Sequence, residues 1–184
     1  MGQVISCIRV KQTKVAVKEH FGKFDGILQP GCHYVPWCLG YQVAGELSMR
    51  VQQHWITCES MTKDHVSVNV TTSVHFHPSE TKVYDAFYKL KNTPLHIQSY
   101  VLSAITENVP KLELNAVFEE KIRIENAVHE ALTEGMSTYG YEIVKTLVVD
   151  IVPSDSVKNA LNENAAAKEK LGQITTARPM AVAT

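Results

Sequence analysis

The first seven residues, Met-Gly-Gln-Val-Ile-Ser-Cys, carry the clearest chemistry in this chain. Gly2 and Ser6 fit the N-myristoylation pattern, in which removal of the initiator methionine exposes the glycine amine. One myristoyl chain binds membranes only marginally, with an association constant on the order of 10⁴ M⁻¹, so stable anchoring needs a second signal. Cys7 is placed to supply it by S-palmitoylation. We therefore predict N-myristoyl at Gly2 and S-palmitoyl at Cys7. The alternative is a chance glycine followed by an ordinary buried thiol.

A basic segment follows these residues. Between residues 2 and 24, five basic residues and one glutamate give a net charge of +4. Each cation near an anionic cytoplasmic leaflet contributes about 1 kcal/mol to membrane binding. We predict that Arg9, Lys11 and Lys14 contact the membrane. No run approaches the roughly 20 apolar residues of a spanning helix, so we expect a protein anchored to a membrane surface.

An uncharged loop is the next candidate for membrane contact. Residues 30–45 contain no Asp, Glu, Lys or Arg, and their prolines and glycines are expected to prevent a strand. Val35, Pro36, Trp37 and Leu39 are predicted to touch the bilayer, because tryptophan is at home in the membrane interface. The alternative is that Trp37 packs inside the domain.

The remaining histidines and cysteines predict neither a metal site nor catalysis. His75 and His77 share a strand, and five residues separate Cys32 from Cys38 in the sequence. A structural zinc site needs more closely spaced cysteines and a second pair of ligands. A thiol enzyme using Cys58 or Cys38 needs a neighbouring histidine that no local motif supplies. Phosphate-binding loops and hydrolase motifs are missing. We therefore expect no catalytic residue, no metal and no cofactor.

Composition limits the class of protein further. With 184 residues, 45% hydrophobic and 20% charged, the chain is long enough for one compact domain or for two small subdomains. A net charge of −1 argues against nucleic acid as a partner. No secretory signal is visible, so the four cysteines are expected to lie in a reducing cytosol without disulfides.

Hydrophobic periodicity predicts short strands up to residue 57 and a strong half-buried strand over 66–76, preceded by a turn at 62–65. The period then changes to helical over 83–90 and 93–109, where Thr93-Pro94 fits a helix start. The second of these helices is expected to bury a stripe of Ile97, Val101, Ala104 and Ile105. A single long helix is predicted over 115–139, with Gly140 as its left-handed cap. Its expected buried arc carries Val117, Phe118, Ile122, Ile124, Val128 and Leu132. A strand over 141–151, stopped by Pro153, is expected to place Tyr141, Ile143, Leu147, Val149 and Ile151 on one face. Strands before helices, with one strand after, indicate an α+β fold.

Motifs along most of the chain resemble the plant hypersensitive-induced response proteins, members of the stomatin, prohibitin and flotillin (SPFH) superfamily. The segments that carry the resemblance are 15–19, 21–25, 30–32, 36–40, 47–53, 62–64, 85–90, 97–101, 109–112 and 136–144. The resemblance runs in order to about residue 167. It implies an α+β SPFH (band 7, prohibitin-homology) domain, in which antiparallel strands pack with three helices. It also implies acylation at Gly2 and Cys7.

The same resemblance implies a function. Such a protein is expected to be a lipid-anchored peripheral scaffold of plasma-membrane microdomains on the cytoplasmic face, and a positive regulator of defence-related cell death. The implied partners are the inner leaflet, self and paralogue oligomers, and receptor kinases or leucine-rich-repeat proteins, without nucleic acid. It is not expected to be an enzyme. The alternatives are a soluble cytosolic adaptor, or a short form that modulates longer paralogues.

Two departures from the family pattern accompany this prediction. Thr106 stands where members usually carry a basic residue, and the long Ala/Glu/Lys-rich helix of the family is cut short at Gly172, which indicates a C-terminally shortened form. The expected organisation is an acylated anchor over 1–7, the SPFH domain over 8–153, the start of a C-terminal helix over 154–171 and a loose tail over 172–184.

Overall fold

The computed structural model describes residues 7–153. The predictions for Gly2, for the C-terminal helix over 154–171 and for the tail over 172–184 lie outside the described residues. The strands are β1 (Cys7–Val10), β2 (Lys14–His20), β3 (Lys23–Leu28), β4 (Gly31–Tyr34), β5 (Tyr41–Ser48), β6 (Gln52–Met61), β7 (Ser67–Pro78) and β8 (Tyr141–Pro153). The helices are η1 (Trp37–Leu39), η2 (Glu80–Lys82), α1 (Val83–Tyr88), α2 (Thr93–Asn108), η3 (Val109–Lys111), α3 (Leu114–Glu119) and α4 (Lys121–Ser137). The predicted α+β class is confirmed.

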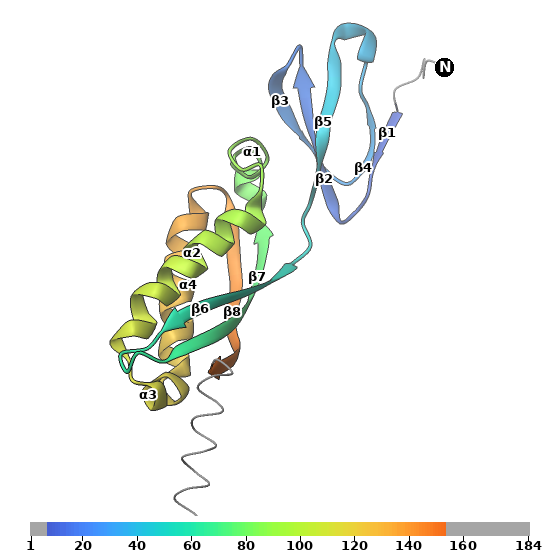
Figure 1. The fold of residues 1–184 in the computed structure, drawn as a ribbon. Helices are drawn as coiled ribbons and strands as arrows, with labels where there is room; N and C mark the ends of the chain where they lie inside the picture. Colours follow the sequence, from blue (N-terminus) through green and yellow to red (C-terminus); the bar gives the residue numbers. More distant parts are fainter. Residues whose placement is uncertain (1–6, 154–184) are drawn as a thin grey trace, which may run out of the picture.

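The first five strands form a small β unit at one end of the molecule (Figure 1). It holds a two-stranded sheet, β1-β4, and a three-stranded sheet in the order β3-β2-β5, with every pairing antiparallel. Val10, Ala16, Val17 and Val35 are buried here and lie outside the main core cluster. We call this part the N-terminal unit.

One element of the N-terminal unit differs from the sequence prediction. Gly31–Tyr34 forms β4, although the glycines and prolines around it were expected to prevent a strand. Gly31 adopts φ +144°, a conformation that glycine tolerates, and β4 is an edge strand paired only with β1. The strand ends before Pro36, which cannot donate to a ladder.

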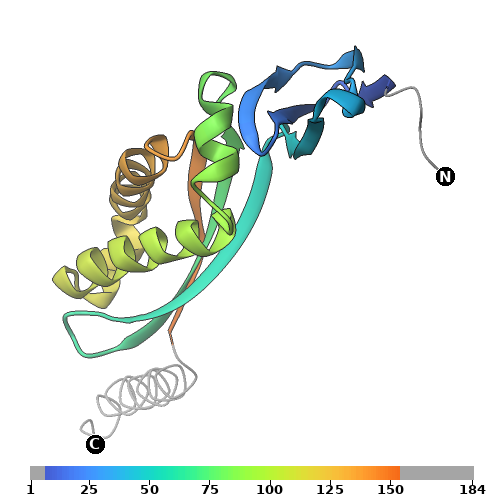
Figure 2. The same ribbon diagram turned by 90° about the horizontal axis from the view of Figure 1, so that it is seen from above.

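The rest of the described chain is a second unit in which α2 and α4 cover one face of a sheet in the order β6-β7-β8 (Figure 2). The predicted strand over 66–76 is confirmed as β7, the central strand, and its alternate residues face the helices. The predicted stripe on α2 is also confirmed, because Ile97, Val101, Ala104 and Ile105 are all buried. These residues join the main hydrophobic core.

The last strand buries only part of the predicted set: Tyr141 and Ile151 are buried, whereas Leu147 is half-buried and Val149 is exposed. Against β7, β8 shifts register twice, between Thr71 and Thr72 and between His75 and Phe76. Each β-bulge adds a residue to β8 and so reverses which face the following side chains occupy. Thr146 and Val148 therefore face the helices, and Val149 is exposed.

The single helix predicted over 115–139 is divided in two. The chain leaves helical geometry at Glu120, with φ −93° and ψ 26°, where α3 ends and α4 begins. Phe118 and Ile122, which the periodicity placed on the buried arc, are both exposed as a result. Gly140 does adopt the predicted left-handed conformation, with φ +76°.

The two units meet along α1. The Phe24 ring of β3 packs edge-on against Tyr84, with 4.9 Å between centroids. A Cβ placed on Gly45 of β5 would approach the Phe87 ring to 2.9 Å, so this contact needs a glycine. These contacts attach the N-terminal unit to the helical side of the molecule.

Candidate functional site

A tight turn between β2 and β3 places an aromatic ring at the end of the N-terminal unit. His20 pairs with Lys23, and the two residues between them both have positive φ, 48° for Phe21 and 77° for Gly22. This is the two-residue hairpin geometry that suits the twist of β-strands. A left-handed conformation costs a non-glycine residue roughly 1–2 kcal/mol, so the Phe21 backbone is strained.

The loop before β5 holds Phe21 in this conformation. The Phe21 N–H donates to the carbonyl oxygen of Gly40 at 3.0 Å, and His20 Nε2 lies 3.1 Å from the Leu39 carbonyl oxygen. A Cβ on Gly40 would come within 2.5 Å of the Phe21 ring, and Gly40 has φ +80°. The β2–β3 turn and the loop containing η1 are therefore held against each other by hydrogen bonds and by the packing of Phe21 on Gly40.

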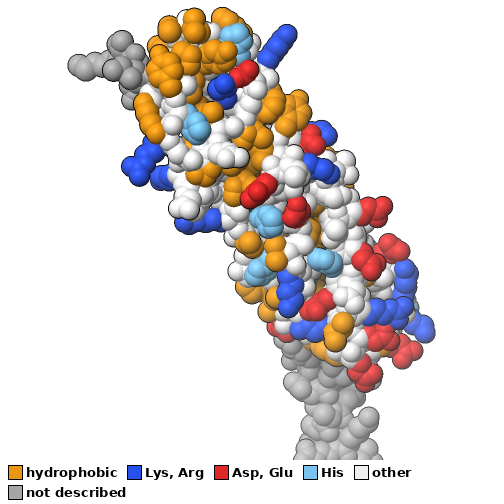
Figure 3. Space-filling view, turned by 180° about the vertical axis from the view of Figure 1, so that it is seen from behind, with side chains coloured by type: hydrophobic (Ala, Val, Ile, Leu, Met, Phe, Trp, Pro, Cys, Tyr) orange, Lys and Arg blue, Asp and Glu red, His pale blue; other side chains and the backbone are white. Residues whose placement is uncertain are grey.

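Four apolar residues of these segments are strongly exposed. The exposed fractions are 78% for Phe21, 72% for Tyr34, 69% for Trp37 and 60% for Leu39. We call these four residues the apolar tip. Figure 3 shows apolar side chains gathered over this end of the molecule, whereas charged groups spread over the second unit. The exposure of Trp37 excludes the alternative in which it packs inside the domain.

The prediction of membrane contact is wrong for one residue of the loop. Val35 is 1% exposed and belongs to the core of the N-terminal unit. Alternation explains the difference, since Tyr34 and Val35 are neighbours at the end of β4 and point to opposite faces. Pro36 is half-buried.

Cys7 lies at the same end of the N-terminal unit as the apolar tip, because β1 pairs Cys7 with Tyr34. Its sulfur is bonded to that of Cys32 in a disulfide, which contradicts the expectation of free cysteines. Cys7 is exposed, so the alternative of an ordinary buried thiol is excluded as well. The chain before Cys7, including Gly2, lies outside the described residues.

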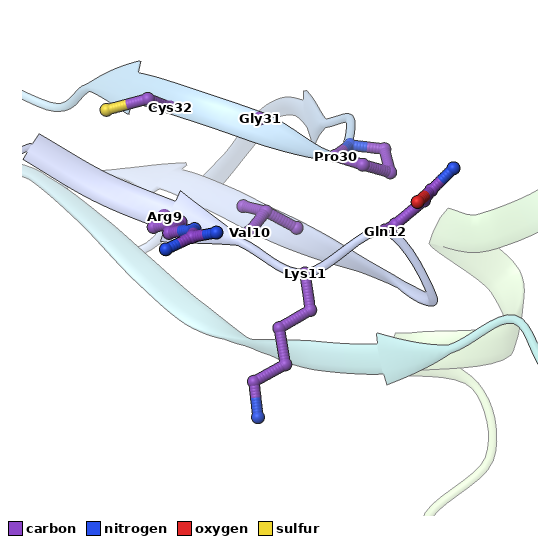
Figure 4. Close-up of a pocket in the computed structure, with 7 residues that line it drawn as sticks. All are labelled: Arg9, Val10, Lys11, Gln12, Pro30, Gly31 and Cys32. Carbon is purple, nitrogen blue, oxygen red and sulfur yellow. The ribbon is translucent and has the colours of Figure 1, made fainter.

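The predicted basic contacts are spread along the unit. Arg9 pairs with Cys32 across β1 and β4, and residues 9–12 and 30–32 line an open hollow at this edge (Figure 4). Lys14 starts β2 and is therefore roughly 20 Å from its other end, where the apolar tip lies. Its ammonium pairs with Glu46 at 2.6 Å and holds the pKa of that carboxyl below its usual range. Lys14 thus already has a partner within the protein.

The histidines and cysteines considered for metal or catalysis do not converge. Within residues 7–153, no group of three His, Cys, Asp or Glu side chains is placed to hold a metal ion. His77 Nδ1 lies 2.9 Å from the Pro78 carbonyl oxygen, and His33 Nε2 lies 2.6 Å from that of Gln29. Burial raises the pKa of the Cys58 thiol to about 11, so this thiol is protonated at neutral pH.

Sequence analysis missed Phe21 and Tyr34 as members of the apolar tip. A signal for Phe21 was present, because an aromatic residue before glycine between two strand-like segments fits a hairpin turn. Tyr34 could not be assigned to the apolar tip from the sequence, because the strand β4 that turns its side chain outward was not expected.

Comparison with known proteins agrees with this architecture. Residues 8–181 match the SPFH domain / Band 7 family. The chain is also 38% identical over 166 residues to hypersensitive-induced response protein 4 of Arabidopsis thaliana, covering 90% of this chain and 57% of that relative. The chain therefore belongs to the SPFH domain / Band 7 family, as its motifs predicted. Among the described helices, none has the length and apolar character needed to cross a membrane.

Proposed function

We propose that this protein is a lipid-anchored scaffold on the cytoplasmic face of the plasma membrane, and that the apolar tip rests in the inner leaflet. The observation that carries the proposal is the exposure of four apolar residues at the end of the N-terminal unit, one of which, Tyr34, pairs with Cys7. An exposed apolar cluster marks a binding surface, and tryptophan and tyrosine suit the membrane interface. Arg9 and Lys23, near the same end, supply cations for anionic headgroups.

Anchoring combines three weak contributions. Myristate on Gly2 is marginal alone, and a palmitoyl chain on Cys7 adds about 0.8 kcal/mol for each buried CH₂. The apolar tip adds contact area close to both chains. Because Cys7 is fixed to the sheet by β1, anchoring there also brings the tip to the bilayer.

The proposed biological role rests on the similarity to the Arabidopsis protein. The similarity to a hypersensitive-induced response protein supports a role in the hypersensitive, defence-related response. We propose that the protein acts there through self and paralogue oligomers and through receptor kinases or leucine-rich-repeat proteins. The face of the β6-β7-β8 sheet opposite the helices is available for such contacts, with Trp55 exposed on it. This is the role of a scaffold, not of an enzyme.

Two tryptophans make a direct test possible. The sequence has two tryptophans, Trp37 and Trp55, which lie in different units. The variant Trp55→Phe keeps only Trp37, and Trp37→Phe keeps only Trp55. Vesicles of phosphatidylcholine and phosphatidylserine are titrated into each full-length variant. Emission from Trp37 is expected to shift to the blue and to be quenched by brominated lipid, while emission from Trp55 stays unchanged.

A matched pair of alanine variants completes the test. Trp37→Ala is expected to weaken vesicle binding several-fold, and Trp55→Ala, which removes a comparably exposed ring from the other unit, to leave it unchanged. Equal behaviour of the two variants, with no spectral shift from Trp37, contradicts the proposal. That result favours the soluble adaptor, in which the apolar tip binds a protein.

A further inference from the structure

Cys7 and Cys32 form a cross-strand pair at the surface of the N-terminal unit. In the β1-β4 ladder Cys7 lies opposite Tyr34 and Cys32 lies opposite Arg9, so the two cysteines occupy diagonal positions on one face. Their Cα atoms are 6.4 Å apart, within the span that a disulfide bridges without backbone movement. Both residues are exposed.

The surroundings of this pair favour thiol chemistry. Arg9, the direct partner of Cys32, carries a permanent positive charge on the neighbouring strand (Figure 4). The thiolate is the form of an exposed cysteine that reacts with oxidants and acyl donors. Cys58 is buried and held protonated, whereas Cys38 is exposed without a bonded partner among the described residues.

We propose that Cys32 controls by oxidation whether Cys7 can be acylated. The inference rests on the proposed acylation of Cys7. One sulfur cannot hold a thioester and a disulfide at once, so the bond to Cys32 blocks the acyl site. In a reducing compartment, an exposed disulfide of this kind is transient and regulatory, not structural.

The two reactions compete for the same thiol. In the reduced protein the Cys7 thiolate attacks the carbonyl carbon of an acyl-coenzyme A thioester, a new C–S bond forms, and the coenzyme A thiolate leaves. With a peroxide as oxidant, one thiolate attacks the O–O bond to give a sulfenic acid and one molecule of water or alcohol. The second thiol then displaces the hydroxyl group as water, so two thiols are oxidised and one peroxide is reduced.

The predicted consequence is a membrane attachment that depends on redox state. Under reducing conditions Cys7 carries its acyl chain and the protein has both lipid signals. After oxidation of the unacylated protein, only the myristoyl chain and the apolar tip remain, and one chain alone gives reversible binding. Newly made protein is therefore retained less at the membrane under oxidising conditions.

The test uses full-length protein expressed in eukaryotic cells, with Cys32→Ser as the variant and Cys38→Ser as the matched control. Cells receive an alkyne analogue of palmitate, with or without prior hydrogen peroxide. Wild type and Cys38→Ser are expected to lose most of their label after peroxide, by several-fold, whereas Cys32→Ser keeps it. Any inhibition of the acyltransferase by peroxide affects all three proteins equally, so label kept by Cys32→Ser alone distinguishes the gate from such inhibition. Cys38→Ser shows that the effect is specific to Cys32.

Mass spectrometry of purified protein tests the bond separately. Peroxide treatment is expected to lower the intact mass of wild type by about 2 Da and to yield a linked peptide pair containing Cys7 and Cys32, absent from Cys32→Ser. Failure to form this pair, or equal loss of label from wild type and Cys32→Ser, overturns the inference. Wild type that carries no label under reducing conditions refutes the acylation and the gate together. A label that peroxide leaves unchanged refutes the gate alone.

Discussion

The Tyr88 hydroxyl of α1 donates a hydrogen bond to Glu19 of β2, with 2.5 Å between Oη and Oε1, and so joins the two units. Partial desolvation of the exposed phenol, together with this hydrogen bond and the nearby carboxylate, raises the pKa of Tyr88 to about 12. The neutral phenol is therefore the form that the folded protein favours.

Tyr88→Phe is expected to lower the free energy of unfolding by about 1 kcal/mol near neutral pH. A raised pKa stabilises the fold fully below the unfolded value, roughly pH 10, and that contribution disappears as the pH rises through 12. The difference between wild type and Tyr88→Phe in urea unfolding should thus shrink above pH 10. Tyr84→Phe, on the same helix, is the control, and a difference that does not change with pH contradicts the assignment.

Gly140→Ala tests the turn between α4 and β8. Gly140 has φ +76°, and an added Cβ would lie 2.5 Å from the Lys82 carbonyl oxygen, so both backbone strain and a clash oppose the side chain. We expect a loss of about 3 kcal/mol or more in thermal or urea unfolding. Gly22→Ala has the matching φ of +77° with open space around it, and should lose only about 1 kcal/mol. Equal losses would show that the clash contributes nothing.

Val35→Ala is expected to destabilise the protein more than Trp37→Ala, although valine is the smaller side chain. Val35 is buried, so removing two methyl groups costs about 2 kcal/mol, while the exposed Trp37 ring contributes within about 0.5 kcal/mol. Urea unfolding of both variants measures this. A loss of about 3–5 kcal/mol for Trp37→Ala would place the ring in the core and remove it from the apolar tip.

Gly2→Ala and Cys7→Ser test the two lipid signals in the cell. Gly2→Ala is expected to release the protein to the cytosol, because without the first acyl chain Cys7 is not held near the membrane. Cys7→Ser should remain weakly and reversibly bound. Membrane fractionation together with intact mass of the protein from its native cell decides both, and Gly2→Ala protein found wholly in the membrane fraction disproves the anchoring.

The sequence by itself determined those elements whose periodicity continues without interruption. On α2, the spacing of Ile97, Val101 and Ile105 identifies the buried stripe, because a regular helix turns through a fixed angle per residue. On β7, alternation from Val68 to Phe76 identifies the face toward the helices for the same reason. The family was also predicted from motifs, which depend on residue order alone.

Only the tertiary structure decided where a regular pattern is interrupted or where distant segments meet. The two bulges of β8 bury Thr146 and Val148 because each inserts a residue that no local signal marks. Phe21 faces Gly40, and Cys7 bonds Cys32, because the pairing of strands brings these segments together across the sheets. Trp37 is exposed and Val35 is buried because β4 forms as an edge strand and sets which of its neighbours points outward. Strand pairing between distant segments is a property of the folded chain, so the place of Tyr34 in the apolar tip and the burial of Val35 could not be read from local sequence.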